Sequence, residues 1–172
     1  MKRTLILLLA AALILTFAGL SLAISVSNDN ESSGGESGLT NGANMWKYIT
    51  KEKPYTKWKL WPGTEKMYEG TQPHGAFLTT YVTKGARKVI EKKKGKFSQG
   101  AIIVKENYMP DKTLAAVTVM YKAKGYNPEA GDWFWAKFKP DGSVEKEGKV
   151  EGCIKCHSAK ADNDWVFTGD IK

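Results

Sequence analysis

Cysteine and histidine are scarce in this chain, which contains two of each among its 172 residues. A structural zinc site takes about four such ligands. His74 is the only cysteine or histidine outside one short segment near the C-terminus, so structural zinc is disfavoured. The two cysteines are separated by only two residues. A disulfide between them would close a very short loop and add little stability.

The segment EGCIKCHSAK contains both cysteines and the second histidine, as Cys153, Cys156 and His157. Cys-x-x-Cys-His is the signature of c-type haem attachment, in which the thiols bond the porphyrin and the imidazole binds the iron. A redox-active dithiol is the alternative, but a thioredoxin-type pair needs a βαβ context that the preceding segments do not predict. The motif therefore indicates one covalently attached haem c, with His157 as an axial ligand of the iron.

The N-terminus begins with a positive pair, Lys2 and Arg3, followed by an apolar run and small residues up to Ala23. This layout is typical of a secretory signal peptide over residues 1–23. The apolar run is close to the roughly 18 residues that can span a bilayer, so an uncleaved membrane anchor is the alternative. Both interpretations predict an exported, periplasmic protein, and haem attachment of this type takes place outside the cytoplasm.

Residues 24–44 are rich in Ser, Gly and Asn and have few large apolar side chains, which predicts a flexible linker. Residues 45–172 have the length of one domain, and the motif within them predicts a haem domain. The net charge of +8 comes largely from runs such as Arg87 to Lys96. Such a run forms a solvated helix face, or a docking surface for an acidic redox partner or an anionic membrane. No nucleic-acid reader motif is present, which argues against nucleic acid as a partner.

Strand signals outnumber helix signals within the expected domain. Residues 76–83, 100–109 and 112–128 are rich in β-branched and aromatic side chains, and 84–94 contains helix formers followed by glycine. Residues 131–152 predict a hairpin with its turn at a Pro-Asp-Gly sequence. The pattern predicts an α+β fold, mainly an antiparallel β-sheet with a few helices around the haem.

The sixth coordination position of the iron distinguishes two functional classes. An electron carrier fills it with His or Met, whereas a catalyst or gas-binding protein leaves it open. The residues of these types outside the attachment motif and the signal peptide are His74, Met45, Met67, Met109 and Met120. His74 lies in a turn-like Pro-His-Gly sequence that also suits a surface position. The sequence leaves the ligation open.

Four segments carry a family resemblance: PHGAFLTTYV, KFSQGAIIVKENY, PEAGDWFWAKF and EGCIKCHSAKADNDWVFT. With the signal peptide and the single motif near the C-terminus, the chain resembles the cytochrome P-460 family from about Tyr55 to Gly169. The resemblance implies a mono-haem β-rich domain whose members commonly form homodimers. It also implies that Lys105, in GAIIVKE, matches a lysine whose side-chain nitrogen is joined covalently to the porphyrin.

Catalytic members of that family oxidise hydroxylamine, and nitric oxide chemistry is also associated with them, which in this chain would take place at a five-coordinate haem. Their distal pocket holds an arginine and a carboxylate, whose matching positions here are Leu78 and Val117. In this respect the chain is similar to the related cytochrome c′-β proteins, whose apolar distal pocket binds nitric oxide or carbon monoxide. Three functions therefore stay open: an oxidoreductase for small nitrogen species served by a soluble redox partner, a gas-binding protein, and a simple electron carrier.

Overall fold

The fold is described from a computed structural model, which describes residues 38–71 and 73–172. The expected signal peptide, residues 1–23, lies outside this range, as does the first part of the expected linker. Within the described residues, no helix has the length and apolar character needed to cross a membrane.

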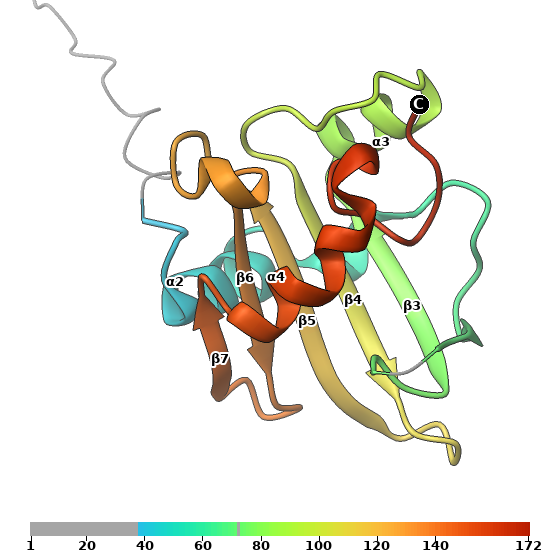
Figure 1. The fold of residues 1–172 in the computed structure, drawn as a ribbon. Coiled ribbons are helices and arrows are strands. Elements are labelled where there is room, and N and C mark those ends of the chain that lie inside the picture. The colour runs from blue at the N-terminus through green and yellow to red at the C-terminus, as the bar shows by residue number, and fades with distance from the viewer. Residues whose placement is uncertain (1–37, 72) are drawn as a thin grey trace, which may run out of the picture. The chain divides into compact units, whose positions relative to one another are not determined.

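One antiparallel sheet of seven strands forms the centre of the domain (Figure 1). The strands are β1 (Lys59–Leu60), β2 (Tyr68–Glu69), β3 (Phe77–Val82), β4 (Ile102–Tyr108), β5 (Leu114–Lys122), β6 (Trp133–Phe138) and β7 (Val144–Gly148). Their order is β1-β3-β4-β5-β6-β7, and β2 also pairs with β3. The α+β class and the hairpin between β6 and β7 are as the sequence predicts.

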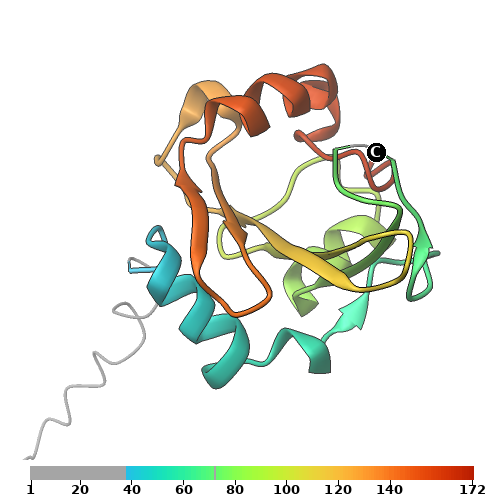
Figure 2. The same cartoon turned by 90° about the horizontal axis from the view of Figure 1, so that it is seen from below.

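Helices cover both faces of this sheet. They are α2 (Gly42–Lys47), the π-helix η1 (Tyr48–Glu52), α3 (Lys84–Glu91), α4 (Glu151–His157) and the short 3₁₀ segments η2 (Tyr55–Lys57), η3 (Pro128–Ala130) and η4 (Ser158–Asn163). In Figure 2 the sheet separates α2 and η1, on one side, from α4 and η4, on the other. The attachment motif predicted from sequence therefore lies on a helix above one sheet face.

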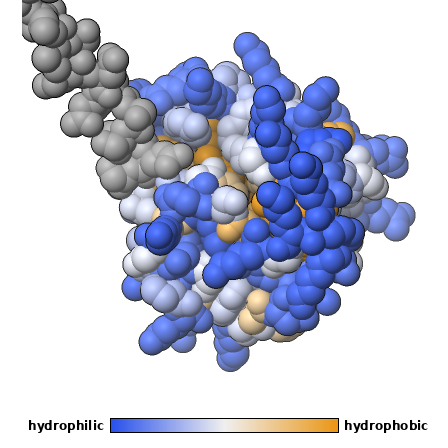
Figure 3. Space-filling model, turned by 90° about the horizontal axis from the view of Figure 1, so that it is seen from above, coloured by the Kyte–Doolittle hydropathy of each residue, from blue (hydrophilic) through white to orange (hydrophobic). Residues whose placement is uncertain are grey.

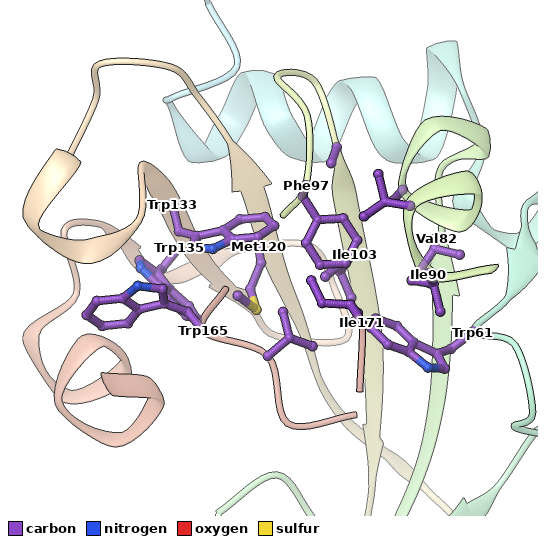
Figure 4. Close-up of a cluster of buried hydrophobic side chains, with 14 of the residues drawn as sticks. Trp61, Val82, Ile90, Phe97, Ile103, Met120, Trp133, Trp135, Trp165 and Ile171 are labelled. Carbon is purple, nitrogen blue, oxygen red and sulfur yellow. The ribbon is translucent and has the colours of Figure 1, made fainter. Parts of the chain in front are cut away.

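The strand register sends alternate side chains into two separate cores. Ile103 pairs with Met120, which pairs with Trp135, and this row belongs to the core on the α4 side. Figure 4 shows Trp133, Trp135 and Trp165 grouped at one end of that core. The intervening residue Phe134 belongs to the second core, under α2 and η1, so β6 has the alternation that its sequence predicts.

The last described residues of the expected linker, 24–44, pack against the folded domain. Leu39 is buried in the second core, and α2 begins at Gly42. Asn41 caps this helix, because its side-chain oxygen accepts a hydrogen bond from the Asn44 amide. One cap and one apolar contact are short local signals, which the Ser/Gly-rich composition around them obscures.

The surface carries the positive charge that the composition indicates. The view in Figure 3 is mostly hydrophilic, and apolar atoms show only in recesses between polar side chains. Helix α3 contributes to this surface with Lys84, Arg87 and Lys88, while its Ala86, Val89 and Ile90 are buried. The basic run is therefore at least partly the solvated face of an amphipathic helix.

Candidate functional site

A cavity of about 470 Å³ lies between α4 and the sheet. Its wall comes from β4, β5, β6 and β7, from α4, from the loop before β3 and from residues 166–168 after η4. The wall is largely apolar, and its polar residues include Lys105, Lys137 and Lys146. None of the described residues that line the cavity is acidic.

Helix α4 presents the whole attachment motif to this cavity. Cys153, Cys156 and His157 all line it, because residues three and four positions apart share one face of an α-helix. Both cysteines are free thiols, and burial raises the pKa of the Cys153 thiol. Two thiols and one imidazole are therefore available to a single bound group.

The His157 ring is held in one tautomer by a backbone group. Its Nδ1 atom lies 2.6 Å from the carbonyl oxygen of Trp165, which only accepts hydrogen bonds. Nδ1 therefore donates, and Nε2 keeps the lone pair that a metal ion needs. Burial lowers the pKa of His157, which favours this neutral form.

A buried ion pair fixes the segment that supplies this carbonyl. Lys122 on β5 donates to Asp164 Oδ1 over 2.6 Å, and the two side chains are only 4% and 6% exposed. Asp164 Oδ2 also accepts from the Phe97 amide at 2.7 Å. Asp164 and Trp165 both have positive φ values, 49° and 70°. These contacts hold the sharp reversal that brings the Trp165 carbonyl back toward α4.

Lys105 lies in the cavity wall. It is paired with Thr80 on β3 and Thr118 on β5, and the side chains of this row point to the cavity side of the sheet. Burial lowers the pKa of Lys105 to about 8, because desolvation penalises the ammonium form. A neutral amine, the form that acts as a nucleophile, is therefore much more accessible here than for a solvated lysine.

The two expected distal positions do not line the cavity. Val117 is fully buried in the second core, on the opposite face of the sheet, and its neighbour Ala116 lines the cavity instead. Leu78 is paired with Asn107 and so lies on the cavity side of the sheet, but it packs near Gly70 and is not a lining residue. Neighbouring side chains of a strand face opposite sides of the sheet, so the residues on either side of Val117, Ala116 and Thr118, line the cavity.

His74 lies across the cavity from His157. Their ring centres are 6.1 Å apart, and the two ring planes are nearly perpendicular. His74 Nδ1 is 3.0 Å from Asn107 Oδ1. Burial, followed by the charge of Lys105, lowers the pKa of His74 to about 4, so the ring is neutral at pH 7. The structure thus brings together the only two histidines of the chain.

Asn107 is one of the lining residues that the sequence did not single out. Asn107 follows Lys105 by two positions on β4, so strand alternation was a usable signal for its facing. Trp135 is 3% exposed, and its Nε1 atom has no hydrogen-bond partner within the described part of the chain. The role of the Trp165 carbonyl had no sequence signal, because any residue carries such a group.

The residues around the cavity fit a haem. The thiols of Cys153 and Cys156, together with the Nε2 lone pair of His157, are the donor set of c-type attachment. Haem also carries carboxylates, which would provide an acceptor for the orphaned Trp135 donor and counter-charges for Lys137 and Lys146, which line the cavity. The mostly apolar wall suits the porphyrin ring.

Comparison with known proteins agrees with this fit. No curated protein matches the chain. The family model for Cytochrome P460 matches residues 52–168, which is more than half of the chain and includes every cavity residue named above. The chain therefore belongs to the cytochrome P460 family and is a haem-binding cytochrome.

Proposed function

We propose that this protein carries one haem c in the cavity, joined by thioether bonds to Cys153 and Cys156, with His157 as the proximal ligand of the iron. The observation that carries this proposal is that one helix, α4, directs both thiols and the imidazole into a single cavity. The hydrogen bond from His157 Nδ1 to the Trp165 carbonyl supports it, because it leaves Nε2 free for the iron.

We further propose that the haem acts on small nitrogen species, and that reversible binding of nitric oxide is the function the cavity favours most. Oxidation of hydroxylamine releases a proton with each electron and therefore needs a proton acceptor near the iron. No carboxylate lines the described cavity. His74, with a pKa of about 4, is a weak base, and Lys105, with a pKa of about 8, is mostly protonated at pH 7. Binding a neutral gas requires neither group.

The test uses protein produced together with haem-attachment machinery. Anaerobic titration of the reduced protein with nitric oxide is expected to change the haem spectrum with one ligand bound per haem. Hydroxylamine with an electron-acceptor dye is expected to be consumed no faster than in the dye-only control. Sustained consumption would replace the binding function by an oxidoreductase function, and an unchanged spectrum in nitric oxide would contradict both.

Lys105 is proposed to bond covalently to the porphyrin edge. Forming a bond between Nζ and a ring carbon replaces one N–H and one C–H bond, so two protons and two electrons pass to an added peroxide, which is reduced to water. The lowered pKa of Lys105 supports the neutral amine that this reaction needs. Proteolysis of the oxidised holoprotein should then give a haem peptide that joins the Cys153 segment to the Lys105 segment. Recovery of the two segments as separate peptides would contradict the cross-link.

Export to the periplasm is proposed from residues 1–23, and a soluble, acidic redox partner is proposed from the basic charge of the chain. Lys137 and Lys146 line the cavity itself, so positive charge lies near the haem site. Cell fractionation tests the first proposal, and a fall in electron-transfer rate with rising salt tests the second. Sedimentation of the holoprotein tests the homodimer that the family resemblance implies.

A further inference from the structure

His74 and His157 are spaced as two ligands of one metal ion. Two imidazoles that bind the same ion have ring centres roughly 6 Å apart, because each metal–nitrogen bond is about 2 Å and each ring adds about 1 Å. The observed distance between the two ring centres is 6.1 Å. This leaves room for the iron between the rings but not for a substrate as well.

The His74 ring is oriented for this role by an asparagine that is itself fixed. The Asn107 side chain is 3% exposed, and its Nδ2 atom donates to the carbonyl oxygens of Lys105, at 2.8 Å, and Ala116, at 3.2 Å. Its Oδ1 atom therefore faces His74 as an acceptor, at 3.0 Å from Nδ1. His74 Nδ1 must donate this hydrogen bond, which leaves the lone pair on Nε2. The same arrangement, with a carbonyl as acceptor, orients His157.

The loop that carries His74 is anchored to the sheet at its C-terminal end, where it enters β3. Ala76 donates to the Tyr108 carbonyl at 2.9 Å, and Gly70 donates to the Ala76 carbonyl at 2.8 Å. Gly75, next to His74, has φ of 123°, and a Cβ atom there would lie 2.7 Å from the Tyr108 oxygen. Only glycine allows this close approach, so the backbone beside His74 has a defined path over the cavity. His74 itself lies in the loop between β2 and β3 rather than in a strand.

We propose that His74 Nε2 binds the haem iron opposite His157 in the resting protein, and that a small ligand binds only after this imidazole has left. This inference rests on the haem site proposed above and adds a regulation of it. The imidazole holds the sixth position in the absence of ligand, so nitric oxide or carbon monoxide competes with a group of the protein itself. A protein that kept this ligand under all conditions would serve as an electron carrier instead.

The experiment uses the holoprotein and reads the spin state of the iron by optical and electron paramagnetic resonance spectroscopy. The wild type is expected to be six-coordinate and low-spin in both oxidation states. His74→Ala is expected to be high-spin, and external imidazole is expected to restore the low-spin spectrum. Carbon monoxide should bind to the reduced His74→Ala variant with at least about tenfold higher apparent affinity than to the reduced wild type, because His74 no longer competes for the iron.

Three further variants separate His74 from other ligands. Asn107→Leu removes the acceptor for Nδ1 and should shift part of the wild-type population to the high-spin form while His74 is still present. Met109→Leu and Met120→Leu remove the two methionines that line the cavity. Conversion to high spin by either methionine variant, with none in His74→Ala, would overturn the proposal.

The wild-type spectrum tests the inference without any variant. A coloured, covalently attached but high-spin wild type would overturn the role of His74 and leave the haem site intact. A protein without covalent haem would overturn the haem site first, so the two failures are distinguishable.

Discussion

The buried pair between Lys122 and Asp164 gives the most quantitative prediction for the fold around the site. Lys122 Nζ donates to Asp164 Oδ1 and to the Gly131 carbonyl, both at 2.6 Å, and it lies 4.6 Å from the centre of the Trp133 ring. Lys122→Met leaves the Asp164 carboxylate buried without its counter-charge. Removing one partner of such a pair costs about 3–5 kcal/mol, a large fraction of the roughly 5–15 kcal/mol that stabilises a domain.

Urea unfolding at pH 7 measures this loss of free energy of unfolding. The matched control is Lys172→Ala, which breaks the pair with Asp162 at 3.1 Å, whose side chains are 51% and 75% exposed. An exposed pair of this kind contributes about 0–1 kcal/mol. The double variant Lys122→Met with Asp164→Leu should lose less stability than the sum of its single variants, because neither charge is then left alone. Equal, small losses for Lys122→Met and Lys172→Ala would refute the reasoning.

Two further predictions concern buried ionisable groups. Glu106 accepts hydrogen bonds from the Tyr55 hydroxyl at 2.9 Å and the Tyr108 hydroxyl at 2.8 Å, on the sheet face opposite the cavity. Glu106→Ala should therefore lower the free energy of unfolding by about 2–4 kcal/mol without changing the haem spectrum. A stability loss no larger than that of Lys172→Ala would contradict this prediction. In protein made without haem, Lys105→Met should be more stable at pH 7 by up to about 3 kcal/mol, because the folded state lowers the lysine pKa to about 8 from its ordinary 10.5. The charged amine is penalised fully below the folded pKa, so the difference should close as the pH rises from 8 to above 10.5 in thermal unfolding scans; a difference that does not change with pH would contradict the assigned pKa.

Much of the sheet was predictable, because its strands satisfy both propensity and alternation. The sequence indicates strands within residues 76–83, 100–109 and 112–128, and these segments contain β3, β4 and β5. Each observed strand is shorter than the segment predicted for it. The helix expected over 84–94 ends at Glu91, since Lys93 and Gly95 have positive φ values. The strands β1 and β2 have two residues each. Such short segments exist through pairing with β3 and have no periodicity of their own.

The shared facing of Cys153, Cys156 and His157 was predictable for a different reason, because it depends on their spacing within one helix. The distal side of the cavity was not, since it depends on register and on long-range placement. A shift of one residue on β5 exchanges Val117 for Ala116 in the wall. The approach of His74 to His157 joins residues 83 positions apart, and it requires the loop before β3 to cross the same cavity that α4 covers.

The proposed function depends on one haem that is joined to Cys153 and Cys156 and bound through His157. Intact-mass spectrometry of the protein matured with haem-attachment machinery, before and after extraction with acidified organic solvent, tests it most directly. The wild type should show a mass increase of one haem that survives extraction and is lost when both cysteines are changed to serine. A wild-type chain whose mass lacks the haem, or that releases it into the solvent, would contradict the account.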